Sequence, residues 1–219
     1  MLVGRHAELA RLESLIGAAR AGSGSAVLIR GVAGVGKTAL LDHSVESAAD
    51  LVVLRATGIP GEAEVAFAGL LEMLRPLLHR LPELPAPQRE VLAGALGLAP
   101  AAERDRFLTG AATLALLLVA AADGPVLACV DDAHWLDTPS LEALLFAGRR
   151  LAGASVGMML AARDEPHPEL DTARLEVLLV PALDREATSA LAAMLTGRSP
   201  DEGTEEIFGR TQGLPLAVA

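Results

Sequence analysis

Short apolar runs alternate with stretches of helical periodicity along most of the sequence. Runs such as SAVLIRG and PVLACVDD are apolar at nearly every position, which is typical of parallel strands covered on both faces. Between them, apolar residues recur every three to four positions, which predicts amphipathic helices. Strands are expected at 25–31, 51–58, 125–132, 155–164 and 175–183, and helices beside them at 6–22, 38–49 and 140–153.

Two regions depart from this alternation. Residues 61–124 read as helical throughout, broken by the proline cluster LPELPAPQ at 81–88. From residue 184 onward the pattern is helical only. We therefore predict a three-layer α/β/α core with a five-stranded parallel sheet over residues 1–182, followed by the beginning of a helical lid over 183–219. Because GLPLAVA stops where an apolar helix begins, we expect a truncated lid and a longer natural protein.

Composition narrows the class of protein. The chain is 52% hydrophobic but only 2% aromatic, so the core must consist of Leu, Val, Ile and Ala. A formal net charge of −10 opposes binding of a polyanion by general electrostatics. Cys129 is the single cysteine, which excludes a disulfide framework and makes a reducing compartment the default. The sequence opens with no secretory leader pattern, and its apolar stretch at 111–124 is too short to span a bilayer, so we predict a cytoplasmic protein without membrane contact.

The segment GVAGVGKT, at residues 31–38, fits the phosphate-binding pattern G-x-x-x-x-G-K-[ST] and lies between a strand and a helix, as that motif requires. Its glycines let successive backbone N–H groups point inward, and the helix start adds positive potential. Lys37 would reach the β- and γ-phosphates of ATP, and the Thr38 hydroxyl would bind Mg²⁺. An incidental glycine turn is the alternative. The predicted nucleotide-binding positions here are Gly31, Val32, Ala33, Gly34, Val35, Gly36, Lys37, Thr38 and Ala39.

An acidic pair ends the strand at 125–132. We assign Asp131 to the magnesium shell and Asp132 to positioning the attacking water, because ligands bind at the carboxyl ends of strands in open α/β sheets. Taken alone, the pair could equally be a turn or a helix cap. Asp132 is one methylene shorter than the glutamate often used for this role, so we expect slow turnover.

Several motifs together resemble one family. They are the loop at 31–38, VDDAHWLD at 130–137, LAARD at 160–164, GLPLA at 213–217 and the opening LVGRHAEL. The chain resembles the signal-transducing (STAND) branch of the AAA+ P-loop ATPases, and most of all the N-terminal ATPase of large LuxR-type (LAL) transcriptional activators. The resemblance implies a P-loop NTPase fold and a switch controlled by ATP and ADP. It also implies a helix-turn-helix DNA-binding module outside this sequence.

The resemblance implies further site residues. Val3, Gly4 and Arg5 match a segment that borders the adenine and ribose, although an N-terminal apolar plug is an alternative. Arg163 matches a position that senses the γ-phosphate, with a salt bridge to Asp164 or Glu165 as its alternative.

Near the end of the sequence, Gly213 and Pro215 match a motif whose proline packs on the adenine side, although proline is also common in a first helical turn.

Other polar or aromatic residues keep two interpretations. His134 and Trp135 could contact nucleotide or belong to the core. Glu64 is a weak candidate for coordinating water. Three arginines could serve as fingers for a neighbouring subunit or be solvated charges: Arg149, Arg150 and Arg174.

We therefore expect a domain that binds Mg-ATP and hydrolyses it slowly to ADP and phosphate, as a weak ATPase. It would act as the regulatory switch of a LuxR-family activator, with self-association of the full-length protein. This chain itself would not contact DNA, which would be bound through the C-terminal module. The alternatives are a signalling ATPase fused to another output, such as a kinase or cyclase, and a nucleotide-binding scaffold without hydrolysis.

Overall fold

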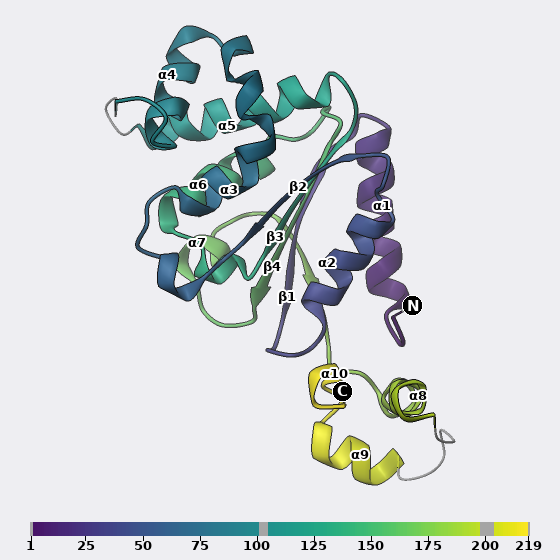
Figure 1. The fold of residues 1–219 in the computed structure, drawn as a ribbon. Coiled ribbons are helices and arrows are strands. Elements are labelled where there is room, and N and C mark those ends of the chain that lie inside the picture. Colours follow the sequence, from purple (N-terminus) through teal and green to yellow (C-terminus); the bar gives the residue numbers. More distant parts are fainter. Residues whose placement is uncertain (1, 101–104, 198–203, 219) are drawn as a thin grey trace.

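A computed structural model describes residues 2–100, 105–197 and 204–218 of the chain. Its centre is a five-stranded sheet in the order β2-β3-β4-β1-β5, and every neighbouring pair is parallel (Figure 1). This arrangement confirms the predicted α/β fold. The strands are β1 Ser25–Gly31, β2 Val52–Thr57, β3 Val126–Asp131, β4 Val156–Arg163 and β5 Glu176–Leu179.

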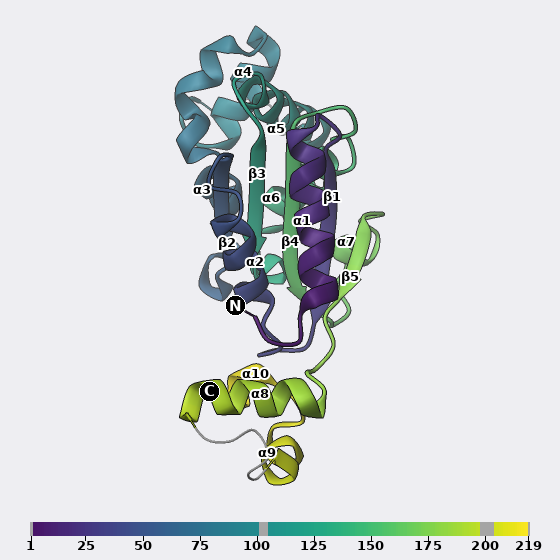
Figure 2. The same ribbon diagram turned by 90° about the vertical axis from the view of Figure 1, so that its right-hand side faces the viewer.

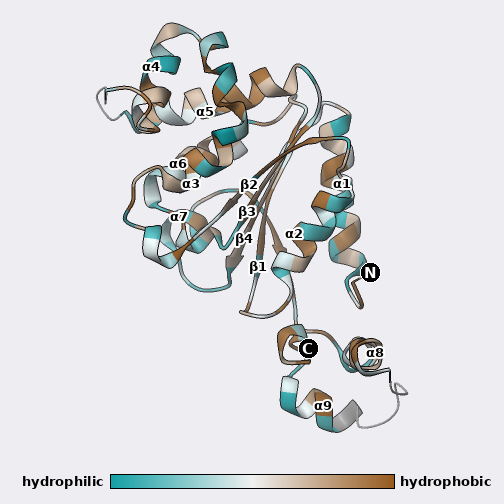
Figure 3. Cartoon of the chain, viewed as in Figure 1, coloured by the Kyte–Doolittle hydropathy of each residue, from teal (hydrophilic) through white to brown (hydrophobic). Residues whose placement is uncertain are grey.

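Alternate residues of the central strands enter two separate cores. In β3, Leu127 and Cys129 pack with the helices on one face, and Ala128 and Val130 pack with those on the other. Both sets are buried because helices cover both faces, which explains why the strands read as continuous apolar runs. The hydropathy colouring shows these apolar strands between the two helical layers (Figure 3). Burial raises the pKa of the Cys129 thiol to about 12, so it is a structural thiol.

Helices cover the two faces unequally (Figures 1 and 2). One face carries two helices, α1 His6–Arg20 and α2 Lys37–Glu46. The other carries the remaining helices of the sheet domain. These are η1 Pro60–Glu62, α3 Ala68–Leu74, η2 Arg75–Glu83, α4 Ala86–Ala95, α5 Arg106–Ala121, η3 Ala133–Trp135, α6 Thr138–Gly148 and α7 Pro168–Asp171.

The helical insertion between β2 and β3 agrees with the prediction for residues 61–124 in the part that the structure describes. The 3₁₀ helix η2 ends at Glu83 and α4 follows Pro85, so the proline cluster does separate two helices. The apolar stretch at 111–124 forms α5 as far as Ala121, and the inward positions of that helix are buried. In the described parts of the chain, none of the helices combines the length and the apolar character that crossing a membrane requires.

The two edge strands, β2 and β5, differ from the expectation of strands that are buried on both faces. In β2, Val52 is 40% exposed, and Arg55 and Thr57 are exposed. Strand β5 departs from the expectation too. It pairs with β1 alone, at one edge of the sheet, and it is short. Val177 is 49% exposed and Leu179 is 62% exposed. Its apolar sequence therefore reflects strand propensity at an edge and not burial.

Three helices follow β5 and lie beyond the carboxyl-terminal edge of the sheet (Figure 2): α8 Arg185–Thr196, α9 Thr204–Thr211 and α10 Pro215–Val218. They touch the N-terminal segment, since a Cβ on Gly4 would collide with Ala187 of α8. The backbone N–H of Leu183 donates to Gly213 O at 2.8 Å, which joins the start and the end of this helical group.

Candidate functional site

The carboxyl ends of three neighbouring strands meet at one edge of the sheet. In the register of β1 and β4, Gly31 lies opposite Arg163. Strand β3, on the far side of β4, ends at Asp131. This topology brings together the three sequence motifs that predicted a site at residues 31–38, 130–137 and 160–164.

The loop from Gly31 to Lys37 has the conformation that its glycines allow. Gly34 and Gly36 have φ values of +75° and +100°, in the left-handed region that glycine reaches without steric cost. A Cβ on Gly31 would lie 2.7 Å from the carbonyl oxygen of Val180. Helix α2 starts at Lys37, directly after Gly36, so its first N–H groups face the loop.

The Lys37 side chain lies under this loop. Lys37 is 7% exposed, and its ammonium donates to Gly31 O at 2.8 Å and to Val32 O at 3.0 Å. Burial lowers the pKa of Lys37, and the carboxylates of Asp132 and Asp131 oppose that shift. The ammonium thus lies against the glycine loop and interacts electrostatically with the acidic pair.

The acidic pair forms a turn at the end of β3. Asp131 Oδ1 accepts the backbone N–H of Asp132 at 2.9 Å. Asp132 has φ +45°, which is unusual for a residue other than glycine, and its side chain is 47% exposed. No group of three or more His, Cys, Asp or Glu side chains within the described residues is placed to hold a metal ion. The acidic pair together with the Thr38 hydroxyl would instead suit a hydrated cation such as Mg²⁺.

Arg163 and His134 lie together beside this turn. The backbone N–H of Arg163 donates to His134 Nδ1 at 3.4 Å, so the neutral ring carries its proton on Nε2. Burial lowers the pKa of His134, and the Asp132 carboxylate opposes the shift. The Arg163 guanidinium lies 5.8 Å from the centre of the Trp135 ring and 3.9 Å from Glu165, so the salt-bridge alternative for Arg163 is present in the structure.

Asp137, at the end of the same motif, has a structural role that the sequence reasoning missed. Its buried carboxylate accepts the N–H groups of Phe67 at 2.7 Å, Ser140 at 2.9 Å and Gly69 at 3.2 Å, and Ser140 Oγ accepts the N–H of Leu70 at 2.8 Å. Asp137 therefore caps α6 and also binds the start of α3. The order D-x-x-S before a helix could have predicted the cap. No local signal points to α3.

A cavity of about 640 Å³ lies between this edge of the sheet and the C-terminal helices. Leu191, Leu195 and Leu216 form its apolar side. Leu216 belongs to the motif GLPLA, although it is not itself a predicted site residue, and no motif includes the other two. The N–H of Leu216 donates to Gly34 O at 3.2 Å, so α10 touches the glycine loop directly. The predicted site residues that line the cavity are Ala33, Gly34, Gly36, Lys37, Thr38, Ala39, Asp132, Arg163 and Pro215.

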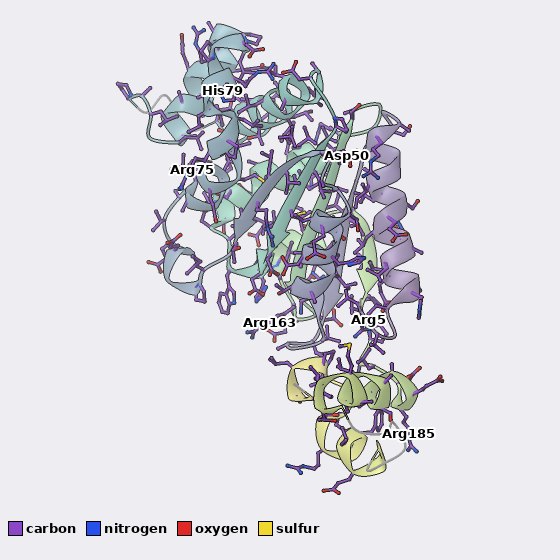
Figure 4. All side chains as sticks on the ribbon, turned by 45° about the vertical axis from the view of Figure 1, so that its right-hand side comes forward. Arg5, Asp50, Arg75, His79, Arg163 and Arg185 are labelled. Carbon is purple, nitrogen blue, oxygen red and sulfur yellow. The ribbon has the colours of Figure 1, made fainter. Side chains whose placement is uncertain are left out.

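A smaller cavity of about 100 Å³ adjoins the first and shares Gly36, Ala39, Leu191 and Pro215 with it. Val3 and Arg5 line it. The Arg5 guanidinium, however, is engaged by the protein: it pairs with Glu8 at 3.0 Å and donates to Val35 O at 2.9 Å and Pro181 O at 2.8 Å. Arg5 thus joins the glycine loop to the segment that leads into α8. Figure 4 shows Arg163 and Arg5 at the end of the sheet domain that faces the C-terminal helices.

Other candidates lie elsewhere. Glu64 is exposed and lines neither cavity. Arg149 and Arg150 lie at the end of α6 and Arg174 precedes β5, on the face covered by α3 to α7.

Comparison with known proteins gives a family. A family model described as "AAA ATPase domain" matches residues 1–160, which is most of the chain. Among curated protein sequences, none matches.

Solved structures share the fold. A chain of the E. coli MS115-1 HORMA:CdnC:Trip13 complex superposes with a TM-score of 0.58 at 16% identity, over 96% of this chain and 74% of that one. A chain of Drosophila ORC bound to DNA superposes with a TM-score of 0.61 at 15% identity, over 100% of this chain and 54% of that one. This chain therefore spans about half of the ORC chain. At such low identity, the likeness extends to the fold alone.

Proposed function

This chain belongs to the AAA ATPase domain family, and from that premise we propose that it binds Mg-ATP and hydrolyses it slowly, as a regulatory switch. The observation that supports the proposal is the convergence of Lys37, Thr38, Asp132 and Arg163 on one cavity of about 640 Å³. Within the family, nucleotide is the ligand that such a cavity fits best. Residues 1–182 would form the ATPase core and 183–219 the lid.

The cradle suits phosphate and a hydrated magnesium ion. Gly34 and Gly36 hold a loop conformation that a side chain would strain, and the loop runs directly into the start of α2. Thr38 and Asp131 would hold Mg²⁺, which when bound neutralises charge on the β- and γ-phosphates. Two oxygen ligands suffice, since Mg²⁺ in proteins keeps several of its waters.

The side chains divide the chemistry among them. Lys37 exchanges its two carbonyl partners for phosphate oxygens, a stronger charge-assisted contact. Asp132 holds the attacking water, and its short side chain makes turnover slow. Arg163 senses the γ-phosphate from the end of β4, within reach of Glu165 as a resting partner. The base lies on the apolar side, near Val3, Gly4, Arg5 and Pro215.

We further propose that the switch belongs to a LuxR-type (LAL) transcription regulator. The support is the set of motifs LVGRHAEL, VDDAHWLD and GLPLA, at matching places in the sequence. DNA would be bound by a separate module, because the net charge of −10 opposes contact with DNA by this chain. A kinase or cyclase output, or a scaffold that does not hydrolyse ATP, stays an alternative. A phosphate-release assay separates the scaffold from the switch.

The sequence offers a sharp test of nucleotide binding, since Lys37 is its only lysine. An acyl phosphate of ATP carries its acyl group on the γ-phosphate. A lysine amine beside the phosphates attacks the acyl carbon, an amide forms, and ATP leaves through its γ-phosphate oxygen while the amine loses a proton. We expect acylation of Lys37 that excess ATP or ADP suppresses, read by mass spectrometry of the peptide. Acylation that excess ATP leaves unchanged would overturn the proposed binding site.

Lys37→Ala should weaken binding of a fluorescent ATP analogue about a hundredfold, because removing one partner of a buried charge pair costs about 3 kcal/mol. Lys37→Arg is the matched control that keeps the positive charge, and it should lose less affinity. Unchanged affinity in Lys37→Ala would contradict the assignment of the phosphate loop.

A further inference from the structure

A separate cavity of about 340 Å³ lies among α5, α6 and α7. None of its lining residues lines either cavity at the glycine loop. It opens on the face of the sheet domain that α3 to α7 cover, whereas the glycine loop and the C-terminal helices meet at the edge of the sheet (Figure 1). The proposed ATP site does not account for it.

Two phenylalanines give this groove an aromatic side. Phe107 is 63% exposed, although large aromatic side chains usually avoid water. Its ring meets the Phe146 ring edge to face, with 5.4 Å between centroids. The Arg150 guanidinium stacks on the Phe146 ring, 3.7 Å from the centre of that ring. The chain has only four phenylalanines, and two of them lie together at this groove. They give it a large apolar contact area.

Four arginines lie at or beside the groove: Arg106 and Arg149 line it, and Arg150 and Arg174 are neighbours of Arg149. Arg149 lies at the end of α6 and donates to the carbonyl oxygen of Ala173, the neighbour of Arg174, at 3.3 Å. Burial lowers the pKa of Arg149, and the positive charges of Arg150 and Arg174 lower it further. Among the residues that the structure describes, no carboxylate forms an ion pair with Arg149, Arg150 or Arg174.

Two carboxylates also line the groove. One oxygen of Glu142 pairs with Arg106 at 2.8 Å, and its other oxygen is buried without a hydrogen-bond partner among the described residues. Glu169 lies 3.2 Å from His167, a pair that carries opposite charges only when the histidine is protonated. These two carboxylates face four guanidiniums at or beside the groove. This excess of positive charge is local, in a chain of net charge −10.

We propose that this groove is a docking site for a short acidic peptide segment of a partner protein, with an aromatic or aliphatic anchor residue. The anchor packs against Phe107 and Phe146, and flanking carboxylates pair with Arg149 and Arg174. Guanidiniums bind carboxylates through two parallel hydrogen bonds, and exposed aromatic and arginine side chains dominate the energetics of many interfaces. Repulsion among the guanidiniums is relieved when carboxylates arrive, which favours an acidic occupant.

Nucleic acid is a poorer occupant for the same surface. Its binding depends on neutralising many phosphates along a backbone, and the groove offers four guanidiniums at one place on an acidic chain. The apolar contact area of the two rings also suits a side-chain anchor.

The test uses the whole chain and a fluorescein-labelled hexapeptide, Glu-Glu-Leu-Phe-Glu-Glu, followed by fluorescence polarisation. We expect saturable binding that weakens as salt rises. Replacing the four glutamates by glutamines, or Leu-Phe by Ala-Ala, should each weaken binding about tenfold, because charge-assisted contacts and anchor residues supply most of the affinity. A glutamine peptide that binds equally well would overturn the proposal.

Protein variants locate the binding. The double variant Arg149→Gln, Arg174→Gln should weaken peptide binding about tenfold or more, whereas Arg75→Gln, an exposed arginine on η2 (Figure 4), should not change it. If the double variant does not fold, Phe107→Ser still removes the aromatic contact at an exposed position.

Three results would overturn the docking site. They are equal binding by the double variant and Arg75→Gln, preferential binding of a single-stranded DNA of equal charge, and self-association that the double variant abolishes while the peptide does not bind. The first result would show that the peptide does not bind at the groove. The second would make nucleic acid the occupant of the groove, and the third would make a second copy of this chain its occupant. ATP binding enters none of these readouts.

Discussion

The two loops that meet at the candidate site reach left-handed backbone conformations by different means. The glycine loop does so at Gly34 and Gly36, where the missing side chain makes positive φ free of steric cost. The acidic loop does so at Asp132, where the same kind of conformation costs about 1 kcal/mol. The first loop is shaped by its own residues, and the second must be held by others.

The contacts that hold the acidic loop come from β2 and α3. The N–H of Gly58, just after β2, donates to Asp131 O at 2.9 Å. A Cβ on Gly58 would overlap the carbonyl oxygen of Asp132. Asp137 fixes the far end of the loop through the N–H groups at the start of α3. A mutation in β2 or α3 can therefore disturb the acidic loop without touching the glycine loop.

The largest expected effect separates the roles of the acidic pair. Asp132→Asn should reduce hydrolysis by about two orders of magnitude, which is typical for loss of a group that positions or deprotonates water, and should keep Mg-ATP affinity. Asp131→Asn should instead weaken the dependence of ATP affinity on magnesium. Phosphate release and calorimetric titrations at several magnesium concentrations measure both. Equal loss of affinity in the two variants would show that the roles are wrongly divided.

The next effect tests whether Gly58 supports the acidic loop. Gly58→Ala should lower the free energy of unfolding by about 2 kcal/mol, because the new methyl group has no room beside Asp132. It should also slow phosphate release more than it weakens ATP affinity. Gly61→Ala is the matched control, since no atom lies within 4 Å of a Cβ at that position. Identical chemical denaturation curves for the two variants would contradict a tight contact at Gly58.

These contrasts explain what could be predicted from sequence. Strand positions and the glycine loop follow from local periodicity and from a motif whose glycines and lysine act within a few residues of one another. Asp137 ends the motif VDDAHWLD, but the motif does not predict its contacts, because its partners Phe67 and Gly69 are about seventy positions away. The contact of Leu216 with Gly34 joins residues that are still farther apart in sequence. Apolarity likewise predicted burial for β5, whereas its place at the sheet edge leaves Val177 exposed.

The smallest effect is the pH dependence of stability that comes from His134, which lies between Asp132 and the end of β4 at Arg163. Burial holds the pKa of His134 below its ordinary value of 6.5. Below that pH, the unfolded chain takes up a proton that the folded histidine resists, so unfolding becomes more favourable. This contribution to stability is present above pH 6.5 and is lost as the pH falls through it. Urea denaturation at pH 7.5 and pH 5.5 should therefore show lower stability at the acidic pH.

The variant His134→Asn isolates that contribution. Asparagine cannot titrate, and its amide oxygen can still accept the N–H of Arg163, so the variant should lose less stability between the two pH values than the wild type. His79→Asn, which removes an exposed histidine on η2 (Figure 4), is the matched control and should keep the wild-type difference. If His134→Asn keeps that difference too, burial of His134 does not tie the acidic loop to the end of β4. Gly58 and Asp137 would then remain as the contacts that hold the acidic loop from outside it.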